Sequence, residues 1–225
     1  LAVAQARLME AQGDLAGALD LLSEAGRQYV RNPLPDQPIA AMKARVCIRQ
    51  GQLGEALAWA REQGLSPGDD LSYLREFEHL TLARVLIECY RNDRDEGSIR
   101  DARYLLDRLL QAAEDGGRTG SVIEILILQA LAHHTQGNAA LACLERALSL
   151  AEPEGYIRTF VDDGEPMRLL IADCRFQIEK RHGRLKQYVD QLLAAFVAAR
   201  LIIHDPQITS PKSEITTLIE PLSER

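Results

Sequence analysis

Small residues recur at fixed spacings along the chain, and this internal repeat constrains the fold more than any other feature. The first unit sets spacings of 3, 4, 5, 4 and 3 residues between Ala6, Met9, Gly13, Ala18, Leu22 and Ala25. The later units are built around the Ala–Gly pairs Ala44 and Gly51, Ala83 and Gly97, and Ala130 and Gly137. The third unit carries seven extra residues in its turn region. The distance between successive turn glycines (Gly13, Gly51, Gly97 and Gly137) sets the length of the repeat, and this length is typical of stacked helical hairpins.

Each unit predicts two amphipathic helices joined by a polar turn that contains glycine. Glycine suits the turn because the residue that follows a helix often adopts a left-handed backbone. Alanine suits the helix faces because a larger side chain would push the two helix axes apart. We therefore expect an all-α solenoid made of four degenerate helical hairpins.

Composition and charge narrow the class of protein further. The 225 residues are 46% hydrophobic and 26% charged, which is ordinary for a folded globular chain. The net charge of −7 makes the chain a poor candidate for direct binding to DNA. Four cysteines lie far apart in sequence, at positions 47, 89, 143 and 174, which indicates a reducing compartment. We predict a cytoplasmic protein without a membrane span.

The pattern divides the chain into three parts. Residues 1–160 hold the four hairpins, and residues 161–203 hold helices that cap the open end of the stack. Two capping helices are predicted over 165–182 and 184–203, and the second presents an apolar stripe made of Tyr188, Leu192, Leu193, Phe196 and Val197. Residues 204–225 lack periodicity and predict a linker that leads into a further domain.

The small-residue frame resembles a tetratricopeptide repeat array, with longer and more degenerate repeats like those of MalT-like regulators. The segment from Ala142 to Met167, which includes TFVDDGEPM, resembles the last repeat and capping segment of LuxR-type, ATP-dependent bacterial transcriptional regulators. The sequence IEPLSER, which ends at Arg225, resembles the entry into a LuxR-type helix-turn-helix. The resemblance implies a tetratricopeptide-like superhelix with a sensor or interaction role. It also implies that ATP binding, DNA binding and multimerisation involve domains outside this chain.

Three segments imitate catalytic or metal-binding motifs and fail on their details. The run DGGRTGS at 115–121 lacks the lysine of a phosphate-binding loop. The calcium-loop pattern at 92–103 places Arg103 where a bidentate acid is required. His133 and His134 are adjacent, so on a helix their side chains point about 100° apart and cannot chelate one metal together. We predict no enzyme activity, no cofactor and no metal site in this chain.

Arginine follows the frame alanine at the same point of three successive units, at Arg7, Arg45 and Arg84. In a superhelix of this type the first helices line the concave face, so the three guanidinium groups could form a ladder there. Extending the frame adds Arg49, Glu88 and His134 to this face. Such a ladder could bind an acidic peptide, a carboxylate or sugar hydroxyl groups. The alternative is that each arginine pairs with an acid on a neighbouring helix, such as Glu10, Glu78 or Glu88.

The sequence leaves two functions open. The chain could be a sensor that binds a small inducer in its concave groove and controls multimerisation of the whole regulator. It could instead be a scaffold that binds a partner peptide in the same groove. A sensor should hold a compact pocket, whereas a peptide scaffold should have a long, open groove.

Overall fold

The computed structural model of the chain describes residues 2–31, 38–134 and 138–204. The hairpin helices are α1 (Ala2–Ala11), α2 (Leu15–Arg31), α3 (Ile39–Arg49), α4 (Leu53–Glu62), α5 (Glu76–Asp93), α6 (Glu96–Asp115), α7 (Thr119–Ala132) and α8 (Asn138–Ala151). They are followed by α9 (Arg158–Val161), α10 (Gly164–Arg181) and α11 (Lys186–His204). Short 3₁₀ turns precede α5 at Tyr73–Arg75 and α11 at Gly183–Leu185. Over the described ranges the chain contains helices and no strand, which confirms the all-α prediction.

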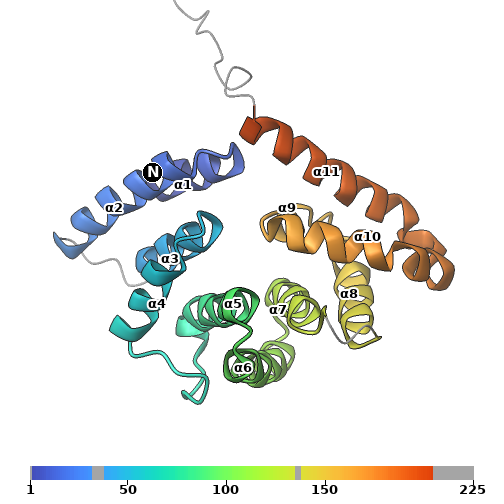
Figure 1. Cartoon of the computed structure of the whole chain (residues 1–225), viewed down its shortest axis with the longest axis horizontal. Coiled ribbons are helices and arrows are strands. Elements are labelled where there is room, and N and C mark those ends of the chain that lie inside the picture. The colour runs from blue at the N-terminus through green and yellow to red at the C-terminus, as the bar shows by residue number, and fades with distance from the viewer. Residues whose placement is uncertain (1, 32–37, 135–137, 205–225) are drawn as a thin grey trace, which may run out of the picture.

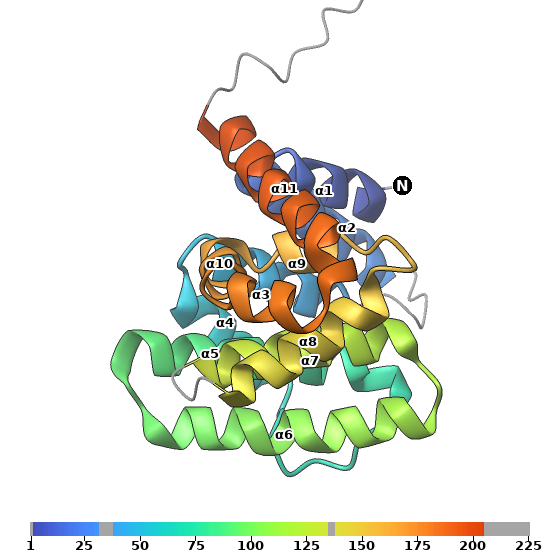
Figure 2. The ribbon, with the colours of Figure 1, turned by 90° about the vertical axis from the view of Figure 1, so that its right-hand side faces the viewer.

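The helices follow one another round an arc, in which successive helices pack as neighbours (Figure 1). Helices α3, α5, α7 and α9 lie on the inner side of the arc, and α4, α6 and α8 lie on the outer side (Figure 1). In the view turned by 90°, α6 runs across the base of the molecule while α11 is steeply inclined to it (Figure 2). None of the helices described is long and apolar enough to cross a membrane.

The small residues of the sequence repeat occupy the buried faces of the first three hairpins. Ala6 and Ala18 are completely buried in the first hairpin. The matching alanines of the next two hairpins are at most 2% exposed, and they are Ala44, Ala56, Ala83 and Ala102. The left-handed turns expected at Gly13 and Gly51 are present, with φ angles of 83° and 75°. The repeat therefore identifies both the packing faces and the turns of the first two hairpins.

The third hairpin differs from the expectation in its turn. The left-handed residue between α5 and α6 is Arg94, with a φ angle of 56°, rather than Gly97. Gly97 lies inside α6, where its backbone N–H and that of Ser98 both donate to the side chain of Asp95 at 3.1 Å. The extra residues of this unit therefore lengthen the two helices instead of forming a loop, because Asp95 caps α6 early.

The fourth hairpin departs from the frame in its second helix. Ala142 is exposed, whereas Ala140, Leu144 and Ala147 are buried. The buried stripe of α8 is therefore offset from the position that the frame predicts. Gly137, on which that frame position depends, lies outside the described residues.

The C-terminal helices pack on the end of the arc. Phe160 of α9 is fully buried and meets the ring of Tyr188 of α11 edge-to-face, with ring centroids 6.3 Å apart. The apolar stripe expected on α11 is buried or half-buried except at Val197, which is 56% exposed. Helix α11 extends to His204, the first residue of the predicted linker, and residues 205–225 lie outside the described part of the chain.

Candidate functional site

Four charged side chains, from three helices and the segment before α10, meet on the inner side of the arc, and we call them the inner cluster: Arg45, Arg84, Glu124 and Asp163. Glu124 of α7 accepts from Arg45 of α3 at 2.8 Å and from Arg84 of α5 at 3.0 Å. Arg84 also donates to Asp163, which directly precedes α10. The cluster therefore joins three successive inner helices to the C-terminal cap.

The sequence around each cluster residue explains why it is held in place. Glu124 is the only charged residue of α7, and it stands among buried aliphatic side chains. Arg45 donates to the hydroxyl of Thr81 at 2.9 Å, and its guanidinium lies 3.7 Å from the ring centroid of Phe77. Such stacking fixes the planar guanidinium and leaves its outer N–H groups free for a carboxylate.

Burial and charge pairing oppose one another in the cluster. The four side chains are between 5% and 21% exposed. Burial alone would raise the pKa of Glu124, but Arg45 and Arg84 outweigh it and lower this pKa to about 2. Burial lowers the pKa of Arg45 to about 10, although the charge of Glu124 opposes this change. Both groups are therefore ionised at neutral pH.

The contact between Arg84 and Asp163 is incomplete. Arg84 Nε and Asp163 Oδ2 are both buried, and neither has a hydrogen-bond partner. Burial raises the pKa of Asp163, and the neighbouring Arg84 counters this only in part. A full arginine–carboxylate fork makes two parallel bonds, so this pair leaves hydrogen-bonding capacity unused on both sides.

The other predicted site residues do not join this cluster. Arg49 pairs with Glu10 of α1 at 3.0 Å, and Glu88 pairs with Arg91 of its own helix at 2.8 Å. Arg7 is exposed and forms no ion pair within the described chain. The continuous ladder of Arg7, Arg45 and Arg84 is therefore wrong as a geometric expectation, because only the last two share a partner.

The alternative of pairing between helices is the better description, although its acids differ from those expected. Glu10 does form an interhelix pair, but with Arg49. Glu78 pairs instead with Arg75 within the same turn, at 2.6 Å. The partners of Arg84 come from α7 and from the segment before α10, which are 40 and 79 residues further along the chain.

A second candidate site is a cavity of about 380 Å³ between the C-terminal ends of α5 and α7, which we call the end cavity. It is lined by Ile87, Tyr90, Arg91, Arg94, Leu131, Ala132 and His134. Of the six residues predicted from the sequence, His134 is the one that lines it. The imidazole Nε2 of His134 lies 3.9 Å from a carboxylate oxygen of Asp173 on α10.

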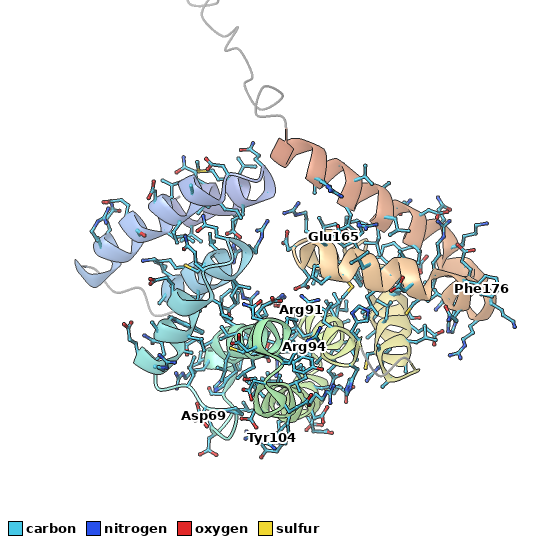
Figure 3. All side chains as sticks on the ribbon, in the orientation of Figure 1. Asp69, Arg91, Arg94, Tyr104, Glu165 and Phe176 are labelled. Atoms are coloured by element: carbon cyan, nitrogen blue, oxygen red, sulfur yellow. The ribbon has the colours of Figure 1, made fainter. Side chains whose placement is uncertain are left out.

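The end cavity combines a buried apolar wall with a basic rim. Ile87, Leu131 and Ala132 are at most 7% exposed. Arg91 and Arg94 lie together at the end of α5 (Figure 3). The guanidinium carbon of Arg94 lies 5.6 Å from the ring centroid of Tyr90, and Arg94 has no ion pair within the described chain. This arrangement offers an apolar surface and an unpaired positive charge to a small ligand.

Sequence reasoning missed four residues of these two regions: Glu124, Asp163, Arg91 and Arg94. The signal for Glu124 was available, since a lone acid in an apolar helix must find a positive partner to be buried. Asp163 lies in the TFVDDGEPM segment, but its sequence does not reveal which of its two aspartates turns inward. Arg94 could not be identified because arginine is an uncommon residue in a left-handed helix cap.

The charged side chains that the structure describes form ion pairs and do not gather into a candidate metal site. Within residues 2–31, 38–134 and 138–204, no group of three or more His, Cys, Asp or Glu side chains could hold a metal ion.

Comparison with curated proteins and with solved structures finds no match. The sequence model of one family, described as the MalT-like TPR region, matches residues 1–177. The chain belongs to this MalT-like TPR family.

Proposed function

We propose that this chain is the sensor domain of a LuxR-type, ATP-dependent bacterial transcriptional regulator, and that the end cavity binds its small inducer. Membership of the MalT-like TPR family supports a sensor or interaction role. The observation that carries the proposal is the end cavity itself, which is bounded by the C-terminal ends of two inner helices.

The dimensions and chemistry of the end cavity suit a small molecule. A volume of about 380 Å³ lies within the usual range for ligand sites, which runs from roughly 300 to 1,000 Å³. Its apolar wall can contact the body of a ligand, and Arg94 can contact a polar or anionic group. No residue of this chain is required to do chemistry on the ligand.

The inducer would act by changing the population of two states of the whole regulator. A ligand shifts such an equilibrium only by the difference between its affinities for the two states. The end cavity lies between α5 and α7, and His134 at its rim approaches Asp173 of α10. A ligand there would therefore contact the repeat helices directly and would reach the cap only through His134, and ATP and DNA would be bound by other domains.

The peptide scaffold has less support. A peptide on the inner side of the arc would meet α9 and the segment that leads into α10. Asp163 already occupies the guanidinium of Arg84. A bound peptide would first have to displace this part of the chain.

The test is native mass spectrometry of the chain after incubation with whole and with desalted cytosolic extract. We expect a small-mass adduct with whole extract, and expect the Arg94→Ala variant to lose it. Arg100→Ala is the matched control, because Arg100 is exposed on α6 and does not line the end cavity. A ligand at about 100 times its dissociation constant should stabilise the fold by roughly 2.7 kcal/mol. In a chain of this size this corresponds to a rise in Tm of about 5–10 °C.

Two outcomes would contradict the proposal. An adduct that Arg94→Ala and Arg100→Ala reduce equally would place the ligand elsewhere. A polypeptide adduct that forms with desalted extract as well as with whole extract, without any small-mass adduct, would favour the scaffold.

A further inference from the structure

One carboxylate fastens the C-terminal cap to the middle of the repeat array. Asp163 immediately precedes α10, a position from which aspartate normally accepts hydrogen bonds from the first amides of its own helix. Its side chain makes no such bond and contacts Arg84 instead, 79 residues earlier in the chain. The side chain of Asp163 thus bonds to α5 instead of capping α10.

The adjacent aspartate shows what the local alternative looks like. Asp162 pairs with Arg158 one turn earlier, at 2.5 Å, and its side chain is 45% exposed. The side chain of Asp163 is only 5% exposed. Two neighbouring residues of identical chemistry therefore have opposite roles, one on the surface and one in the inner cluster.

The inner cluster without Asp163 would be a site for an anion. Arg45, Arg84 and Glu124 together carry one net positive charge, and all three side chains are largely buried. Arg84 keeps an unpartnered Nε–H even with Asp163 in place. Glu124 neutralises only one of the two guanidinium groups, and an uncompensated buried charge is unfavourable, so this site favours a second negative partner.

We propose that the inner cluster is a carboxylate-binding site that the chain fills with its own Asp163, and that an external carboxylate can displace this residue and release the cap. Asp163 then acts as a latch between α5 and the segment formed by α9 and α10. Its unused Oδ2 makes it an imperfect occupant, since a free carboxylate can present both oxygens to the cluster. The raised pKa of Asp163 is consistent with an ion that is buried at a cost.

Release of the latch would change the exposed surface of the molecule. Phe160 and Val161 of α9 directly precede the two aspartates and are buried, at 0% and 7% exposure. Phe160 lies against Tyr188 of α11 and would move with the cap if the segment separated from the inner helices. The same movement would uncover the inner faces of α5 and α7, which become available to a partner. This site is distinct from the end cavity, and the proposal stands whether or not that cavity binds an inducer.

The first test measures hydrogen exchange of Asp163→Asn, with Asp162→Asn as the matched control. A latch predicts that amides in α9 and α10 exchange at least about tenfold faster in Asp163→Asn, while those in α3 to α7 keep their rates. Asp162→Asn should leave both regions unchanged. Uniformly faster exchange along the whole chain, or no change in the cap, would show that Asp163 is not a latch.

The second test adds sodium acetate to the wild-type chain at neutral pH, with sodium chloride at equal ionic strength as the control. Acetate, and not chloride, should speed exchange in α9 and α10 of the wild-type chain. In Asp163→Asn the cap is already released, so acetate should have no further effect there. Equal effects of the two salts on the wild-type chain, or none, would overturn the carboxylate site.

A second variant covers the case in which Asp163→Asn does not fold, as judged by circular dichroism. Asp163→Glu keeps the charge with a longer side chain, so a looser latch should respond to acetate at a lower concentration than in the wild-type chain. A response at the same or a higher concentration would contradict the proposal. Neither test uses an inducer or an extract, so a failed latch leaves the adduct experiment on the end cavity unaffected.

Discussion

The inner cluster and the end cavity share helix α5, but the arginines of α5 in these two regions differ in burial and in ion pairing. Arg84 is 15% exposed and contacts both Glu124 and Asp163. Arg94, ten residues further along the chain, is exposed in a left-handed turn and has no ion pair within the described residues. The difference arises because later parts of the chain place Glu124 and Asp163 beside Arg84, whereas they place no acidic partner beside Arg94 within the described residues.

This contrast shows which basic residues of the array are available for binding. Where the chain supplies its own carboxylates, an arginine holds helices together, and its removal should damage the fold. Where no acid arrives, the arginine contributes little to stability and can be used by a ligand.

Replacing Arg84 by methionine should produce the largest loss. Glu124 and Asp163 would then stay buried with less positive charge between them, and breaking such a pair costs about 3–5 kcal/mol. Arg94→Met should change the free energy of unfolding by no more than about 0.5 kcal/mol, as expected for an exposed site. Urea denaturation of both variants measures the difference, and equal losses would remove the distinction between the two regions.

Acid should weaken the inner cluster through Glu124. Its pKa falls from the ordinary 4.5 to about 2 in the folded chain, so its contribution is complete above pH 4.5 and is lost as the pH falls towards 2. The amount is on the order of 3 kcal/mol. The raised pKa of Asp163 acts in the opposite direction, because a carboxyl that binds its proton more readily in the folded state offsets part of this loss.

The measurement is the free energy of unfolding between pH 6 and pH 2.5, for the wild-type chain and for Glu124→Gln. The variant should be less stable at pH 6 and should lose less stability over this range. Parallel curves for the two proteins would show that Glu124 does not carry the acid sensitivity.

Replacing Arg94 by glycine should have the smallest effect on stability and the opposite sign. A left-handed backbone costs a residue with a side chain about 1–2 kcal/mol, and the greater freedom of glycine in the unfolded chain cancels part of this gain. We expect Arg94→Gly to raise the free energy of unfolding by about 0.5–1 kcal/mol. Thermal denaturation provides the measurement, and a lower Tm would mean that the Arg94 side chain stabilises the turn.

The sequence predicted those parts of the fold that depend on local spacing. Buried alanines such as Ala6 and Ala83 follow from the need for close helix contact, and Gly51 follows from its left-handed turn. The repeat failed where another residue could do the same task, as Arg94 does in place of Gly97. The prediction also failed at Val197. Periodicity identifies the apolar face of a helix, but it does not show how far along the helix other elements cover that face.

The candidate site was harder to predict because its partners are distant in sequence. The repeat identified Arg45 and Arg84 as equivalent positions, and both belong to the inner cluster. Which acids they meet depends on how later helices pack, and Asp163 comes from the cap rather than from a repeat. The end cavity has no sequence signature, because it forms where the ends of two helices fail to fill the space between them.

The reach of Asp163 back to Arg84 also bears on how the chain unfolds. In a simple repeat array each unit touches only its neighbours, so the ends can fray while the middle stays folded. A contact across 79 residues ties the last helices to the third hairpin, and neither can come apart without breaking it. We therefore expect this chain to melt in a single cooperative transition rather than repeat by repeat.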